Sequence, residues 1–165
     1  MNSAEIEVAW RNFKAAAQTY CGVIASAGEI DDSETLYERL APPLAELFAA
    51  GLQLPSVAPS LDEFEAIERS SERQREIFER LDRLTGSDDP YRTIFHPQED
   101  EKPVEAALAD DLAGIYEDVL PATQWDDRGH LNDLIFELRL AFQHHWGRHA
   151  LEAMRVMYWR HHRYR

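Results

Sequence analysis

The sequence predicts an all-α fold, a single-domain helical bundle of five or six helices over residues 1–165 with a long C-terminal helix. Apolar residues recur at three- and four-residue steps along most of the chain, as they do in amphipathic helices. No segment shows the alternation typical of strands, so no sheet is expected. The 165 residues, 44% of them hydrophobic, are enough to form one core.

The first half of the chain predicts two helices joined by a short turn. The first is expected to begin at a Ser3 cap and to end near Gly28. The second begins at Asp32 or Ser33. The pair Pro42-Pro43 either kinks this helix or splits it, because proline lacks the amide donor and clashes with the preceding turn.

A third helix is expected to run unbroken from Ser60 to about Leu84. Ser60 and Glu63 have the spacing of a capping box, which marks the start of a helix. Residues 85–102 then form an irregular stretch that is long for a compact domain. Because this stretch contains Tyr91 and other large apolar residues, we expect it to lie on the bundle and to cover part of it.

The last third of the chain predicts two more helices. Pro103 is expected to open a fourth helix that ends near Leu120, because proline is favoured at the first helical position. The last helix runs from about Leu131 to at least Trp159 and is apolar on two opposite arcs. It is therefore either the central helix of the bundle or a helix whose second arc contacts another copy of the chain. The second arc contains Phe136, Leu140, Gly147, Leu151, Met154 and Tyr158.

Charge is distributed unevenly along the chain, whose net charge is −14. Residues 1–127 carry 28 acidic and 10 basic side chains, whereas residues 128–165 carry 3 acidic and 7 basic side chains together with six of the seven histidines. An acidic surface repels phosphate backbones and anionic lipids, so no nucleic acid and no membrane is expected as a partner. The basic C-terminal segment is expected to pack back onto the acidic remainder of its own chain.

The single cysteine, Cys21, excludes a disulfide within the chain and favours a reducing compartment. Cys21 lies on the apolar side of the first helix and is expected to fill space in the core. Neither a signal peptide nor a stretch of 18 apolar residues is apparent. The sequence therefore predicts a cytoplasmic protein.

Acidic residues of the fourth helix fall on both of its sides. Asp111 lies inside the apolar arc and Asp118 at its edge, whereas Asp110 and Glu117 are expected to point into water. An ionised carboxylate that faces a core is costly unless it is paired. Asp111 is therefore expected to face a histidine or an arginine of the last helix.

His145 and His149 fall near the centre of the first apolar arc of the last helix, and their i,i+4 spacing lets both reach one point. A zinc-protease motif is absent, because Trp146 stands where such a motif needs glutamate. Three interpretations remain open for these histidines together with Asp111 and Asp118. They form structural ion pairs or hydrogen bonds, they bind a divalent metal, or they take part in catalysis.

Several segments share a pattern with one bacterial family. They are Tyr20-Cys21, Tyr91-Arg-Thr-Ile-Phe-His-Pro97, Leu108-Ala-Asp-Asp-Leu-Ala-Gly-Ile-Tyr116-Glu-Asp118 and His145-Trp-Gly-Arg-His-Ala150. Together they resemble a family of small bacterial proteins that is classed as a domain of unknown function. His96 departs from the family pattern, which has aspartate at that position. The resemblance implies no activity, but it implies that one set of residues shares a neighbourhood. These residues are Tyr91, Asp110, Asp111, Tyr116, Asp118, Trp146 and His149.

Two functions are compatible with these observations. The first is a non-enzymatic interaction or binding domain, with a protein partner or a second copy of the chain bound through the last helix. The second is a pocket for a metal or a small molecule, with hydrolase activity as one variant, between the helix of Asp110–Asp118 and the helix of His145–His149. No cofactor is expected for the first function, and a divalent metal is compatible with the second.

Overall fold

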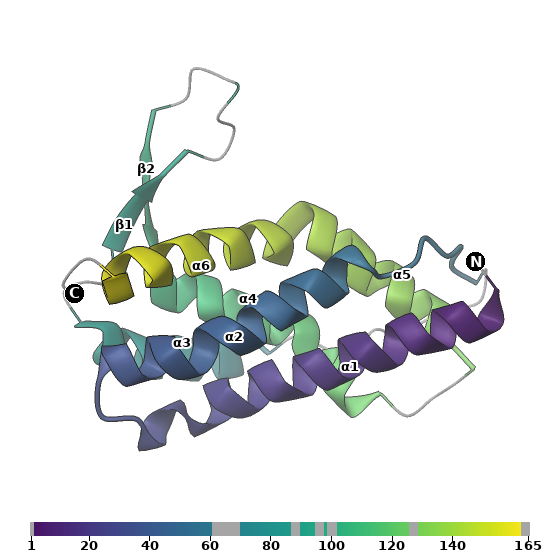
Figure 1. The fold of residues 1–165 in the computed structure, drawn as a ribbon, viewed down its shortest axis with the longest axis horizontal. Coiled ribbons are helices and arrows are strands. Elements are labelled where there is room, and N and C mark those ends of the chain that lie inside the picture. Colours follow the sequence, from purple (N-terminus) through teal and green to yellow (C-terminus); the bar gives the residue numbers. More distant parts are fainter. Residues whose placement is uncertain are drawn as a thin grey trace.

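The computed structural model describes residues 2–60, 70–86, 90–94, 98, 102–125 and 129–162. Its elements are α1 (Ser3–Ala25), the 3₁₀ turn η1 (Ser26–Glu29), α2 (Ser33–Leu52), α3 (Ser71–Thr85), β1 (Pro90–Thr93), β2 (Val104–Ala107), α4 (Leu108–Gln124), α5 (Leu131–Ala141), the π-helical segment η3 (Phe142–Trp146) and α6 (Gly147–His162). Figure 1 shows α1 and α2 side by side, with α4 and α6 packed against them. The predicted all-α class is confirmed. No described helix combines the length and the hydropathy that crossing a membrane requires.

The start of α1 is set by a capping box one residue earlier than expected. The side chain of Asn2 accepts a hydrogen bond from the amide of Glu5 at 3.0 Å, and the Glu5 carboxylate accepts one from the amide of Asn2 at 2.8 Å. Ser3 is therefore the first helical residue and not the cap. The second helix is not split, because α2 continues through Pro42 and Pro43 as one helix.

The predicted third helix is not continuous. Ser70 is in an extended conformation and caps α3 by accepting a hydrogen bond from the amide of Arg73 at 3.2 Å, so an unbroken helix from Ser60 is wrong. The hydroxyl of Ser60 donates to Asp133 at 2.9 Å. Glu63, the other half of the predicted capping box, lies outside the described residues.

A short antiparallel hairpin interrupts the helices, so the expectation of no sheet is wrong. In the ladder, Pro90 lies opposite Ala107 and Thr93 lies opposite Val104. Strands of four residues are too short for their alternation to be recognised in a sequence. Pro103 therefore precedes a strand, and α4 begins only at Leu108. The hairpin stands out from the bundle beside the C-terminal half of α6 (Figure 1).

The central helix of the bundle is α4 and not the last helix. Every residue from 111 to 120 is buried, and α4 packs against α1, α3 and α6. The helix also continues beyond its predicted end at Leu120, through Pro121 to Gln124. Because α4 is enclosed on all sides, acidic residues on any of its faces need partners.

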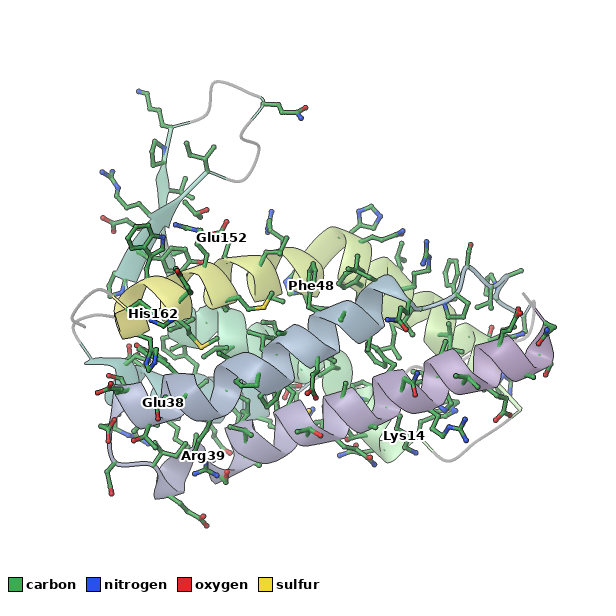
Figure 2. All side chains as sticks on the ribbon, viewed as in Figure 1. Lys14, Glu38, Arg39, Phe48, Glu152 and His162 are labelled. Atoms are coloured by element: carbon green, nitrogen blue, oxygen red, sulfur yellow. The ribbon has the colours of Figure 1, made fainter. Side chains whose placement is uncertain are left out.

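The last helix is continuous from α5 to α6, but it contains the π-helical segment η3. At this segment the fully buried Trp146 packs against Phe142 and Phe13, with ring centroids 4.7 and 6.0 Å away. A Cβ atom on Gly51 of α2 would lie 2.7 Å from the Trp146 ring, so only glycine fits there. Phe48 of α2, shown in Figure 2, completes this aromatic contact against Phe142.

Glu117 was expected to point into water, and the structure buries it instead. Its side chain is 3% exposed, and it accepts hydrogen bonds from the Arg73 guanidinium at 2.5 and 2.7 Å and from the amide of Ser70 at 3.0 Å. The carboxylate thus ties the start of α3 to the middle of α4. The negative charge of Glu117 is compensated by the guanidinium of Arg73, which is about one-third exposed and reaches Glu117 from the surface.

Removal of the Glu117 carboxylate is expected to destabilise the fold. Glu117→Ala leaves Arg73 and the Ser70 amide without their acceptor, which should lower the free energy of unfolding by about 1–3 kcal/mol. The control is Glu79→Ala, which removes an exposed carboxylate 3.9 Å from Arg75 and should cost less than about 1 kcal/mol. Urea unfolding followed by circular dichroism compares the two variants. Equal losses would show that burial of Glu117 is not the cause.

The thiol of Cys21 is expected to be unreactive in the folded protein. It is buried, and burial together with the negative charge of Glu117 raises its pKa to about 12. Because the thiolate is the reactive form, iodoacetamide at pH 8 should modify Cys21 only after unfolding. Mass spectrometry of native and urea-treated protein checks this. Rapid alkylation of the native protein would contradict the buried position.

Candidate functional site

Asp111 lies in the first turn of α4, directly after the hairpin, and its carboxylate joins three segments of the chain. The residue is only 3% exposed. Its Oδ1 atom lies 2.6 Å from Nδ1 of His149 in α6, and its Oδ2 atom accepts a hydrogen bond from the hydroxyl of Tyr91 in β1. The predicted contact between Asp111 and a histidine of the last helix is present, and the predicted proximity of residues 85–102 is provided by Tyr91.

Tyr91 reaches Asp111 because β1 pairs with β2, which leads directly into α4. Burial, followed by the hydrogen bond to Asp111 and the negative charge of that carboxylate, raises the pKa of Tyr91 well above its usual value. The phenol therefore keeps its proton and acts as the donor. The guanidinium of Arg155 in α6 lies 5.8 Å from the centre of the Tyr91 ring, and this contact holds the base of the hairpin on α6. The same guanidinium forms a 2.5 Å ion pair with Glu152.

A second pair of the same kind lies two helical turns further along α4. Oδ2 of Asp118 is 2.5 Å from Nδ1 of His145. Asp118 is 4% exposed, whereas the side chain of His145 is 47% exposed. The rings of His145 and His149 meet edge to face, with centroids 4.6 Å apart. We call Asp111, Asp118, His145 and His149 the Asp–His cluster.

The two carboxylates determine which nitrogen of each ring faces outward. An ionised carboxylate only accepts hydrogen bonds, so Nδ1 of each histidine carries the proton in these contacts. Nε2 of each ring is then the atom that remains for another ligand, in both His145 and His149. Gly114 lies between the two aspartates on α4, and a Cβ atom there would be 3.8 Å from Cε1 of His145, next to Nε2. A longer side chain at position 114 would crowd this ring.

Three residues of the predicted neighbourhood lie elsewhere. Asp110 is exposed and belongs to the outer side of the first turn of α4. Tyr116 is buried on another side of the helix, where burial and the nearby Cys21 raise its pKa. Trp146 lies in the core against α1 and α2. His96 lies outside the described residues, and a functional role for the neighbourhood stays a prediction.

The structure also brings together a group that the sequence analysis did not single out. Ligand atoms of Glu34, Glu38 and His161 all lie within 4.8 Å of one another, where α2 begins and α6 ends. Oε1 of Glu38 is 3.9 Å from Nε2 of His161. Figure 2 labels Glu38 and the neighbouring His162 at this end of the bundle. The i,i+4 spacing of the two glutamates was visible in the sequence, but their pairing with the C-terminal helix was not.

The second apolar arc of the last helix is only partly covered by the chain itself. Gly147 is buried, and Phe136 and Met154 are partly buried. Leu140, Leu151 and Tyr158 remain 40, 51 and 62% exposed, and the adjacent Trp159 is 61% exposed. We call Leu140, Leu151, Tyr158 and Trp159 the outward face. They are half of the large hydrophobic residues that are exposed in the described part of the chain.

Loss of the Asp111 carboxylate is expected to destabilise the protein more than loss of its neighbour. Asp111→Ala leaves the Tyr91 hydroxyl and the Nδ1 proton of His149 without an acceptor, which should cost about 1–3 kcal/mol. Asp110→Ala removes an exposed carboxylate from the same helical turn and should cost less than about 1 kcal/mol. Urea unfolding of both variants measures the difference, and similar values would contradict a central role for Asp111.

Comparison with known proteins gives a consistent result for the fold. The crystal structure of protein BF1032 from Bacteroides fragilis superimposes with a TM-score of 0.76 over 90% of this chain and 89% of that chain, at 19% sequence identity. No curated protein matches the sequence. The family described as "Domain of unknown function (DUF5063)" matches residues 5–163. The resemblance seen in the motifs is thereby confirmed at the level of the family, and the chain belongs to this domain family.

Proposed function

We propose that this chain is a non-enzymatic interaction domain that binds its partner through the outward face of the last helix. The observation that carries the proposal is the concentration of exposed apolar side chains on one helix. Isolated surface hydrophobic residues are common, but a row of them along one helix is typical of a protein interface. Leu140, Leu151 and Tyr158 follow one another along this helix, with Trp159 beside them.

The charge of the same helix supports a second copy of the chain as the partner. Arg148 and Arg155 are exposed among the apolar side chains of α6, in a segment of net charge +4. Residues 1–127 have a net charge of −18. A second copy therefore offers an acidic surface that complements the basic rim of the outward face. Burial of the large side chains would supply the affinity, and the arginines would orient the two chains.

Catalysis is less well supported than binding. The described part of the Asp–His cluster contains carboxylates, imidazoles and the Tyr91 hydroxyl. An Asp–His pair can orient a general base, but nothing described here supplies the second half of a nucleophilic mechanism. The residues of the Asp–His cluster therefore support binding better than they support catalysis.

Self-association is tested with charge substitutions on the outward face. Sedimentation velocity of the wild-type chain over a range of concentrations should show a monomer–dimer equilibrium. The double variant Leu151→Asp/Tyr158→Asp should remain a monomer, because carboxylates at an apolar interface lose hydration without a partner. The control is Val8→Asp, which changes a comparably exposed apolar residue on α1 and should still dimerise.

Circular dichroism of each variant establishes that the helices are intact. A wild-type protein that sediments as a monomer at its highest attainable concentration would refute a second copy as the partner. Equal dimerisation of the double variant and the control would instead show that chains associate through another surface.

A further inference from the structure

The Asp–His cluster has the arrangement that proteins use behind metal-binding histidines. A histidine that binds a metal through one ring nitrogen commonly donates the proton of the other nitrogen to a carboxylate, which orients the ring. Both His145 and His149 donate from Nδ1 to a buried carboxylate, at 2.5 and 2.6 Å. The two rings are thus already oriented, and in both of them the nitrogen that remains is Nε2.

The spacing of the two rings also suits one shared ion. Histidines four residues apart on a helix point to the same side and can chelate a single metal. Their ring centroids are 4.6 Å apart. Gly114 leaves room on the facing side of α4. A Cβ atom at this position would have Cε1 of His145 as its nearest neighbour, at 3.8 Å. An ion between the rings would therefore not meet a side chain from position 114.

The local charge favours a dication. Asp111 and Asp118 are 3 and 4% exposed, and each carboxylate lies directly behind one of the two imidazoles. A doubly charged ion on the two imidazoles would be attracted by both carboxylates. Because the imidazoles must be neutral in order to bind a metal, the carboxylates would act as outer partners that increase the electron density on each ring.

We propose that His145 and His149 bind one divalent transition-metal ion through their Nε2 atoms, with Asp118 and Asp111 as the outer partners. Imidazole ligands suit Zn²⁺, Ni²⁺ and Cu²⁺. The chain supplies two ligands, so water or a second molecule occupies the remaining coordination positions. This inference is independent of self-association through the outward face and goes beyond it.

The competing candidate is the group of Glu34, Glu38 and His161. It offers three ligand atoms within 4.8 Å, but it is largely exposed, and both glutamates already interact with other parts of the chain. In the described residues the buried Nδ1 atom of His161 has no hydrogen-bond partner, whereas Asp118 stands behind His145. This group therefore enters the experiment as the alternative binding place.

The test is isothermal titration of the full chain with Ni²⁺ and with Zn²⁺, accompanied by thermal unfolding with and without the ion. The wild type should bind one ion, and the ion should raise the melting temperature. His145→Ala and His149→Ala should each abolish binding at this site. The matched control is His144→Ala, which removes an exposed histidine next to His145 and should leave affinity and stoichiometry unchanged.

Asp118→Asn separates a metal site from a merely structural histidine. The asparagine oxygen can still accept the hydrogen bond from His145, but the negative charge is gone. The variant should therefore fold and yet bind the ion about 10–100-fold more weakly. Unchanged affinity would refute the role of the carboxylate.

Two further outcomes would overturn the proposal. In the first, neither ion binds to the folded wild-type chain. In the second, His161→Ala abolishes binding while His145→Ala and His149→Ala do not, which would place the ion at the end of the bundle instead. Sedimentation of His145→Ala and His149→Ala keeps this result separate from self-association, because these variants retain the outward face.

Discussion

The fold depends on pairing the carboxylates that α4 and α5 bury. Asp111, Glu117, Asp118 and Asp133 are the buried acidic side chains in the described part of the chain. An unpaired carboxylate in such a place would cost more than most single contacts contribute. Each of the four instead contacts a specific donor from a different segment. Pairing therefore determines which segments lie next to α4 and α5, and the apolar contacts alone would specify this less precisely.

The effect is clearest where a carboxylate holds irregular chain. Asp133 at the start of α5 accepts hydrogen bonds from the amide and the hydroxyl of Ser60, at 2.5 and 2.9 Å. Burial raises the pKa of Asp133, but the hydrogen bonds from Ser60 and the contact with His130 together lower it by more. The net pKa therefore lies below the usual value. Glu117 holds the start of α3 in the same way. The connection after α2 and the start of α3 are thus fixed from the inside of the bundle.

The sequence predicts part of this pattern, and the reason for each failure is physical. Asp111 could be predicted because it interrupts an apolar arc. Glu117 could not, because a helical wheel assumes one buried side, whereas α4 is buried all round. The hairpin escaped notice because each strand has four residues and Pro103 resembles a helix start. The cap at Ser70 was visible as a residue type, but the neighbouring charged residues continue a helical pattern across it.

The π-helical segment η3 explains why the last helix differs from the regular α-helix that the sequence predicts. It also explains why His145 and His149 lie outside the core. In a regular α-helix the buried line that runs through Leu138 and Phe142 would continue to positions 145 and 149. A π-helical turn advances the hydrogen-bond register by one residue. The buried line therefore continues through Trp146 and Ala150, both of which are fully buried. His145 and His149 move to the side of the helix that faces Asp118 and Asp111.

The same shift requires glycine at the end of the segment. A Cβ atom at Gly147 would lie 2.4 Å from the carbonyl oxygen of Phe142, and Trp146 fits only because Gly51 has no side chain. The large ring in the core, the two small residues around it and the paired histidines are therefore parts of one local arrangement. A chain with an ordinary α-helix here would direct both imidazoles along the buried line that Trp146 and Ala150 now occupy. The π-helical segment thus places the two histidines beside an enclosed helix, while Leu140, Leu151 and Tyr158 of the same continuous helix remain exposed.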